Sequence, residues 1–341
     1  MKSFLLVSLS LCLIAQPANA AAPTNNGTLG VYFENDLFAG TDRYYTNGTK
    51  LSWSSPDLSE YRDSPYASPF LPLFDALPYI NETAYQKNLV FAIGQSIYTP
   101  DNTESYALSR NDRPYAGWLY VGVGAVLKNE RVRNSLILDV GVVGSYSYAQ
   151  ETQRYIHDAR GFDHPNGWDN QLHNELGVML AYERTWRIPH IVRRSGFEWE
   201  LLPHAGAVVG NVKTHANFGG EFRFGFNLPD DFGTGVIGPA SSTSTPVDGT
   251  MGASRSWFPL GTYFFARADG RAVGRNVFVD GNTFGDSHSV GHCLFVADLS
   301  AGIAMNYKNT KIAYAFVYRT KEFDQQIADQ VFGTVSVNWT F

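Results

Sequence analysis

The chain has 341 residues, with 26 lysine and arginine residues against 32 aspartate and glutamate residues, a formal net charge of −6. No run of basic residues could follow a phosphate backbone, so nucleic acid is excluded as a partner. Aromatic residues make up 14% of the chain and charged residues 17%. After the first twenty residues, no stretch offers the roughly 18 consecutive apolar residues that a spanning helix needs. The composition excludes a helical membrane protein and favours a β-barrel with aromatic girdles.

The N-terminal residues 1–20 are typical of a cleaved secretory signal peptide. Lys2 precedes an apolar run, and Ala18-Asn19-Ala20 supplies small residues at the cleavage site. Cys12 does not follow a small residue, as a lipoprotein cysteine would, so cleavage after Ala20 is expected. The remaining residues 21–341 then contain a single cysteine and no intramolecular disulfide, and we expect them to form one domain.

Alternation of apolar and polar residues is the main secondary-structure signal. Between residues 217 and 226, phenylalanines alternate with polar residues that include Glu221 and Arg223, and residues 311–319 repeat the pattern. In the stretch 262–273, Arg267, Asp269 and Arg271 share the polar face. Apolar residues that face outward and polar residues that face inward are the signature of a barrel embedded in lipid.

Twelve segments with this alternation are predicted to be strands, and the last of them ends on Phe341, which resembles an outer-membrane assembly signal. An even number of strands returns both termini to the periplasmic side, and closure pairs every backbone donor and acceptor within the lipid. The predicted fold class is all-β, a transmembrane antiparallel β-barrel of about 12 strands. The predicted strands are residues 28–33, 48–54, 88–95, 116–127, 134–146, 174–187, 197–210, 216–226, 261–274, 291–307, 310–320 and 331–341.

The longer irregular stretches lie between these strands, and on a barrel we expect them to be extracellular. Residues 229–247, rich in Pro, Gly and Ser, are predicted to be an exposed loop. Residues 150–160 are helix-forming and precede Gly161, which predicts a short helix in an extracellular loop. The irregular stretches are residues 55–87, 96–115, 147–173, 227–260 and 275–290.

Oxygen-bearing side chains end the first strand, at Glu34-Asn35-Asp36. Alternation places Glu34 and Asp36 on one face and Asn35 on the other, unless the strand bulges. Hard oxygen ligands suit calcium, although Asn and Asp are also common turn residues.

Histidines in the loop of residues 147–173 are candidate general bases. Gln153 and His157 are one helical turn apart if the helix forms, and Asp163-His164 is an equally good candidate on chemistry alone. The spacing does not choose between them. Gly285-Asp286-Ser287-His288-Ser289 is similar to a serine-esterase block, but it lies in a late loop.

The ordered set of motifs resembles the lipid A 3′-O-deacylase family. The set consists of Glu34-Asn35-Asp36, Tyr45-Thr46-Asn47-Gly48, Gln95 with Ile97-Tyr98-Thr99-Pro100, Asn111-Asp112-Arg113, and Gln150-Glu151 before His157. The resemblance implies a twelve-stranded barrel of the bacterial outer membrane, with a calcium-dependent site near the outer rim beside a loop helix.

By motif position, the resemblance implies catalytic roles for Asn35, Asp36, Thr46 and His157, and so selects His157 over His164. It also implies that Ca²⁺ is bound by Asp36 and Asn35. The resemblance also implies a metal-site role for Asp163, at a position where the family has glutamate. The aspartate side chain is shorter than that of glutamate, and this chain differs from the family in that respect.

The implied reaction is hydrolysis of the ester-linked 3′ acyloxyacyl chain of lipid A by water that His157 activates. Lipid A, or lipopolysaccharide, and outer-membrane lipids are the implied partners, and a monomer is expected. Two alternatives are an outer-membrane phospholipase with Ser287 or Ser289 as nucleophile, and a barrel without catalysis that serves as a pore or adhesin. The inward charges, such as Arg267 and Asp269, fit either a plugged lumen or a narrow channel.

Overall fold

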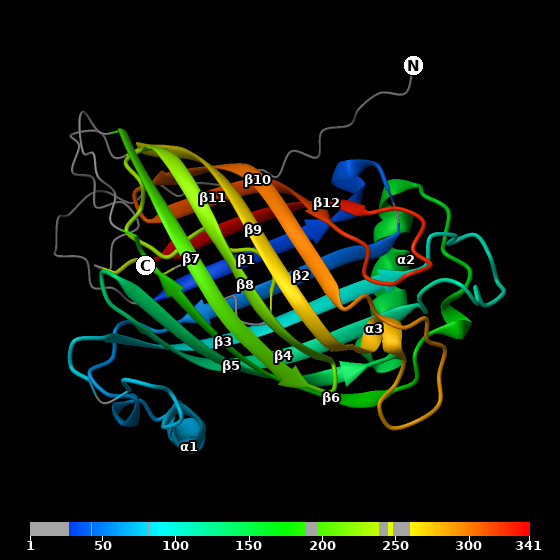
Figure 1. Ribbon diagram of the computed structural model, residues 1–341, viewed down its shortest axis with the longest axis horizontal. Coiled ribbons are helices and arrows are strands. Elements are labelled where there is room, and N and C mark those ends of the chain that lie inside the picture. Colours follow the sequence, from blue (N-terminus) through cyan, green and yellow to red (C-terminus); the bar gives the residue numbers. More distant parts are fainter. Residues whose placement is uncertain (1–26, 42, 81, 189–196, 239–244, 248–259) are drawn as a thin grey trace.

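A computed structural model describes residues 27–41, 43–80, 82–188, 197–238, 245–247 and 260–341. The signal peptide predicted for residues 1–20 lies outside these ranges. Over the described ranges, twelve antiparallel strands form one closed barrel in which β1 pairs with β12 (Figure 1). The predicted all-β barrel of about 12 strands is confirmed.

The strands agree with the predicted segments to within a few residues at each end. They are β1 (Thr28–Asn35), β2 (Tyr44–Ser54), β3 (Gln86–Thr99), β4 (Ala116–Lys128), β5 (Val132–Val143), β6 (Glu175–Trp186), β7 (Phe197–Gly210), β8 (Lys213–Phe226), β9 (Leu260–Asn276), β10 (Phe295–Tyr307), β11 (Thr310–Arg319) and β12 (Gln330–Thr340).

Short helices occupy the connections. They are the 3-10 helices η1 (Asp36–Ala39), η2 (Tyr61–Asp63), η3 (Ser68–Phe70), η4 (Ser145–Ser147) and η5 (Trp168–Asn170), and the α-helices α1 (Leu71–Phe74), α2 (Ala149–Arg160) and α3 (Val277–Asp280). The predicted loop helix is confirmed as α2, and it ends where Gly161 adopts a left-handed φ of 69°. None of the helices in the described part of the chain is long and apolar enough to cross a membrane.

Alternation along each strand sorts the side chains into a lipid face and a lumen face. On β8, Phe218 and Phe226 are 70% and 54% exposed, whereas Glu221 and Arg223 are buried. This distribution is the reverse of that in a water-soluble protein, and it is stable only where hydrocarbon surrounds the wall.

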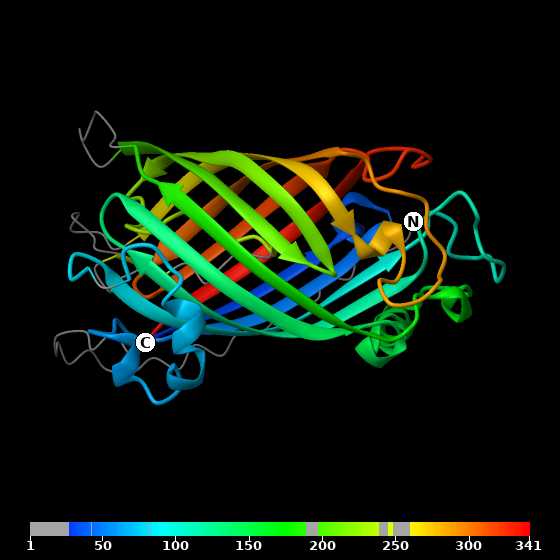
Figure 2. The same ribbon diagram turned by 60° about the horizontal axis from the view of Figure 1, so that its bottom comes forward.

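The connections alternate between the two ends of the barrel because neighbouring strands are antiparallel. The connections 55–85, with α1, and 227–238 follow even-numbered strands and therefore start at the end of the barrel that carries the C-terminus, opposite α2 and α3 (Figures 1 and 2). The prediction that all long loops are extracellular is wrong for 55–87 and for residues 227–238 of the stretch 227–260, in which residues 239–244 and 248–259 lie outside the described ranges. The order of a connection along the chain determines its side, and its length does not.

The segment 229–238 enters the lumen instead of forming the predicted exposed loop. Asp231 is fully buried, and its carboxylate accepts hydrogen bonds from Arg223 Nη1 and Lys311 Nζ, both at 2.6 Å. The carboxylate of Glu221 accepts from Thr234 N at 2.9 and 3.0 Å. Charges on the inner wall therefore hold this segment inside the lumen. Asp231 lies at the end near the C-terminus, and Ile237 reaches Glu34 near the opposite end of β1.

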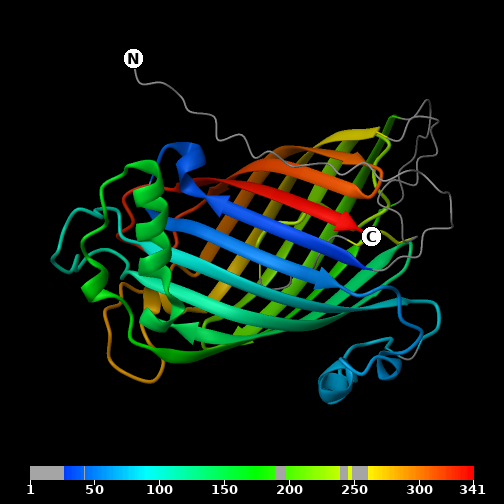
Figure 3. The same cartoon turned by 180° about the vertical axis from the view of Figure 1, so that it is seen from behind.

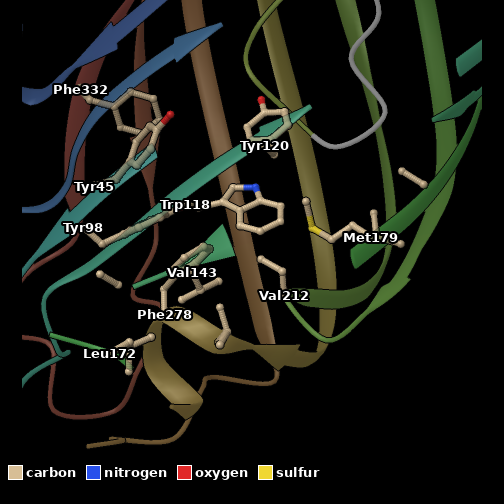
Figure 4. Close-up of a cluster of buried hydrophobic side chains, with 14 of the residues drawn as sticks. Tyr45, Tyr98, Trp118, Tyr120, Val143, Leu172, Met179, Val212, Phe278 and Phe332 are labelled. Atoms are coloured by element: carbon tan, nitrogen blue, oxygen red, sulfur yellow. The ribbon is translucent and has the colours of Figure 1, made fainter. Parts of the chain in front are cut away.

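The opposite end of the lumen is closed by side chains and by α3. Arg113 Nη1 forms an ion pair with Glu322 Oε2 at 2.9 Å, and the Arg113 guanidinium carbon lies 4.8 Å from the centroid of the Tyr98 ring. Burial alone would raise the pKa of Glu322, but Arg113 and neighbouring cations lower that pKa to about 2. Tyr98 also stacks on Phe278 of α3 within the aromatic cluster of Figure 4. Between the two closed ends an internal cavity of about 160 Å³ remains.

Replacing Lys311 with methionine should destabilise the barrel, because the buried Asp231 carboxylate loses one of the cations that compensate it. Removing one partner of a buried ion pair costs about 3–5 kcal/mol. Guanidinium-induced unfolding of the refolded barrel in detergent measures the loss. Lys321→Met, at an exposed lysine, is the matched control, and equal stability of the two variants would contradict the anchoring role of Lys311.

Candidate active site

Asn35 lies on the outer face of the barrel, at the end of β1. Its neighbour Glu34 points into the lumen, where its carboxylate accepts from Ile237 N at 2.8 Å and from the Tyr45 hydroxyl at 2.9 Å. The strand ends at Asn35, whose Oδ1 accepts from Leu37 N at 2.8 Å and caps η1. The expectation that Glu34 and Asp36 share a strand face does not hold, because Asp36 already belongs to η1.

Asp36 is fully buried at the outer rim. Its Oδ2 accepts from Arg43 N at 2.6 Å, and Arg43 Nη1 forms an ion pair with Asp101 Oδ1 at 2.6 Å. Gly40, with a φ of 75°, reverses the chain between these residues. The short connection between β1 and β2 therefore holds the Asp36 carboxylate in a fixed position beside Asn35.

Thr46 lies at a β-bulge, where the register between β2 and β3 shifts between Tyr45 and Asn47. The Thr46 side chain is buried, and its Oγ1 is 2.8 Å from Thr99 Oγ1. Asn47 is the partner of Asn35 across the two strands. The bulge lets Tyr45 fill the lumen while Thr46 joins the outer face next to Asn35.

Helix α2 packs against the outside of the wall through one face. Its buried residues, Ala149, Gln153 and His157, are spaced by four and therefore share that face. Gly117 on β4 permits the close approach, because a side chain there would collide with Ser147 and Ala149.

The indole of Trp168 contacts the same face of α2. Its Nε1 donates to Gln153 Oε1 at 2.9 Å. Ile97, Tyr115, Ala149 and Trp168 form one buried cluster between the helix and the wall. The wall-facing side of α2 is therefore fixed at its N-terminal half.

A row of paired strand residues connects Gly117, where α2 contacts the wall, with Asn35. The row is Gly117, Ile97, Asn47 and Asn35, on β4, β3, β2 and β1, and it spans about 14 Å at the usual strand spacing. His157 follows Ala149 by about 12 Å along the helix axis. Figure 3 shows α2 crossing outside these strands, with its C-terminal end toward η1. The wall-facing side of α2 thus leads from Gly117 toward the rim that carries Asn35, Asp36 and Thr46.

His157 is buried, and the protein holds the Nδ1 side of its ring. Nδ1 lies 2.6 Å from the main-chain oxygen of Asp163, and Phe162 packs edge-on against the ring with centroids 5.8 Å apart. A carbonyl oxygen only accepts, so Nδ1 carries the proton and Nε2 is the basic nitrogen. His164, in contrast, is exposed and contacts Asp158 Oδ1 at 2.6 Å.

Oxygen donors at the rim match calcium in chemical type. Asp36 supplies a buried carboxylate, and Asn35 and Thr46 supply amide and hydroxyl oxygens. The side chain of Asp163 is exposed, and its main-chain oxygen contacts His157. Within the described ranges, no group of three or more His, Cys, Asp or Glu side chains could hold a metal ion. A calcium site here would therefore depend on neutral oxygens as well as Asp36.

Two residues that support the candidate active site, Thr99 and Trp168, were not predicted from the sequence. Thr99, the partner of Thr46, lies in a recognised motif, but only the bulge places the two hydroxyls together. Trp168 lies in a loop that carries no periodic signal. The serine string forms loop contacts instead, since Ser287 Oγ accepts from Asn282 N at 2.7 Å and His288 Nε2 contacts Asp112 O at 2.7 Å.

Comparison with known proteins identifies the family. Residues 5–341 match the family model described as outer membrane protein LpxR. LpxR from Salmonella typhimurium aligns with a TM-score of 0.72 and 20% identity over 92% of this chain and 100% of its own. The β domain of the Bordetella autotransporter BrkA aligns with a TM-score of 0.44 and 10% identity over 93% of this chain and 100% of its own. No curated protein matches the chain. The chain therefore belongs to the LpxR family of outer-membrane β-barrels, and it is an ester hydrolase, a lipid A 3′-O-deacylase.

Proposed function

We propose that His157 acts as the general base in hydrolysis of the ester-linked 3′ acyloxyacyl chain of lipid A, and that water attacks without a covalent acyl-enzyme. The observation that carries this proposal is the buried position of His157 on the wall-facing side of α2, with Nδ1 held by the main chain of Asp163. A neutral imidazole oriented in this way can take a proton from water at Nε2.

The location on the barrel suits a lipid substrate. Asn35, Thr46 and the buried face of α2 lie outside the wall at the rim opposite Thr28 and Thr340, which is the extracellular rim in a barrel of this kind. A lipid of the outer leaflet can reach this surface by lateral movement. Its sugar head group then meets the rim while its acyl chains remain in hydrocarbon.

Asp36 and Asn35 would hold Ca²⁺, and Asp163 is a further candidate ligand. Bound there, calcium would supply positive charge to the ester carbonyl and to the oxyanion that develops on it. Asp36 fits this task because its buried carboxylate is fixed by the Arg43 main chain. Thr46, fixed by Thr99, would orient a ligand or the attacking water.

The two alternatives receive less support. A serine phospholipase needs a histidine beside its nucleophile, and in the described part of the chain Ser287 Oγ accepts from a backbone amide. A passive pore needs an open lumen, whereas the segment 229–238 and the Arg113–Glu322 pair occupy the two ends.

Removing the base should slow deacylation. His157→Ala and His157→Gln in folded barrels are expected to lose about a hundredfold to ten-thousandfold in rate. Mass spectrometry of lipid A, which follows loss of the 3′ acyl mass, measures the effect. His164→Ala is the matched control and should remain active. Full activity of His157→Ala would refute the assignment.

Removing calcium should also stop the reaction. A chelator is expected to abolish loss of the 3′ acyl chain, and added Ca²⁺ should restore it. Asp36→Asn should raise the calcium concentration needed for half-maximal activity, because the site loses its buried charge. Undiminished deacylation in the chelator would rule out a metal at this site.

Displacing α2 should impair catalysis while the barrel stays folded. Gly117→Val would collide with Ser147 and Ala149 and push the helix away from the wall. We expect at least about a hundredfold loss of rate, since small misplacements of a catalytic group are costly. Gly270→Val is the control, because the nearest atom to a side chain there is 3.7 Å away. If Gly117→Val retained the wild-type rate, the position of α2 would not control the base.

A further inference from the structure

A folded segment covers the outer wall near the C-terminus, far from the candidate active site. Tyr61, Phe74 and Leu77, on the connection between β2 and β3, are buried against outward-facing residues such as Leu127 and Leu136. Figure 2 shows α1 of this segment at the end opposite α2. The segment therefore occupies a place on the outer wall where lipid would otherwise lie, at the inner-leaflet boundary.

Arg184 faces outward beside this segment. Its neighbours on β6, Glu183 and Thr185, line the internal cavity, so alternation places Tyr182, Arg184 and Trp186 on the outer face. Arg184 lies two residues before the end of β6, which is the level of the aromatic girdle in a membrane barrel.

Two aromatic rings flank the Arg184 guanidinium. Its central carbon lies 5.1 Å from the ring centroid of Tyr79 and 5.7 Å from that of Trp186. Tyr79 comes from the covering segment and stacks on Tyr85, with centroids 5.9 Å apart. On the β7 side the partner of Arg184 is Ala205, whose small side chain leaves room beside the guanidinium. The result is a cationic group between aromatic walls, accessible from the lipid side.

The protein supplies no opposite charge to Arg184 within the described ranges, where no ion pair joins a carboxylate to its guanidinium. The guanidinium hydrogen-bonds to the neutral hydroxyl of Tyr182, and its Nε is buried without a hydrogen-bond partner. Neighbouring arginines differ, since Arg133 pairs with Glu183 and Arg187 pairs with Glu200. An arginine on the lipid face is far less costly near the interface than at the midplane of the membrane. A phosphate at the interface would compensate this charge.

We propose that Arg184, Tyr79 and Trp186 form a binding site for the phosphodiester head group of an inner-leaflet phospholipid. The guanidinium can donate two parallel hydrogen bonds to phosphate oxygens. The two rings are amphipathic and suit the depth of the head groups. The site lies at the opposite end of the barrel from the proposed deacylation site and takes no part in that reaction.

Native mass spectrometry of the refolded full-length barrel tests this site. The detergent-solubilised protein is titrated with phosphatidylglycerol, and bound lipid is counted for wild type, Arg184→Gln and Arg131→Gln. Arg131, exposed in the turn between β4 and β5 at the same end, is the matched control. Arg184→Gln should bind phosphatidylglycerol about tenfold more weakly, and Arg131→Gln should match wild type.

Further measurements separate recognition from folding. Thermal midpoints in lipid-free detergent and deacylation rates should be the same for Arg184→Gln and wild type. Diacylglycerol with the same acyl chains should bind without dependence on Arg184, and millimolar inorganic phosphate should not displace the lipid. Equal phosphatidylglycerol binding by wild type and Arg184→Gln would overturn the proposal, as would displacement by phosphate alone.

Discussion

Backbone amides and carbonyls cannot remain unpaired in hydrocarbon, and closure of the sheet meets that constraint. The pairing of β1 with β12, from Thr28 with Thr340 to Asn35 with Gly333, completes the ring. Closure also fixes the register, and register decides which side chains face the lipid. A slip by one residue would turn Asn35 into the lumen and Glu34 out toward the membrane. The geometry of the candidate site therefore depends on the same hydrogen bonds that keep the barrel in the bilayer.

The alternation of apolar and polar residues was sufficient to predict the strands of the barrel wall. Alternation identifies each strand because hydrocarbon outside and polar groups inside act on every second residue, and Gly161 marks the end of α2 for a local conformational reason. The length of a loop could not predict the end of the barrel at which the loop lies, because that end follows from the order of the strands. The lumen segment depends on partners far apart in sequence, such as Lys311 with Asp231, which no local window contains.

The candidate site was predicted in part. Motif positions named Asn35, Asp36, Thr46 and His157, but the bulge at Thr46 and the brace from Trp168 to Gln153 arise from tertiary contacts. The contact between His157 and Asp163 uses the main-chain oxygen. That contact is indifferent to the length of the side chain, so aspartate in place of glutamate at this position leaves the orientation of the imidazole unaffected. A functional difference between aspartate and glutamate at this position would have to arise from the location of the side-chain carboxylate.

The occupied lumen has a consequence for the cell that makes this protein. In the described part of the chain, charged side chains and an inserted segment lie across the lumen, so the barrel offers no wide aqueous route for nutrients or antibiotics across the envelope. Encounter with the substrate then takes place in two dimensions, within the plane of the leaflet. Turnover should depend on the fluidity of the membrane and on crowding at its surface, and not on traffic through the barrel.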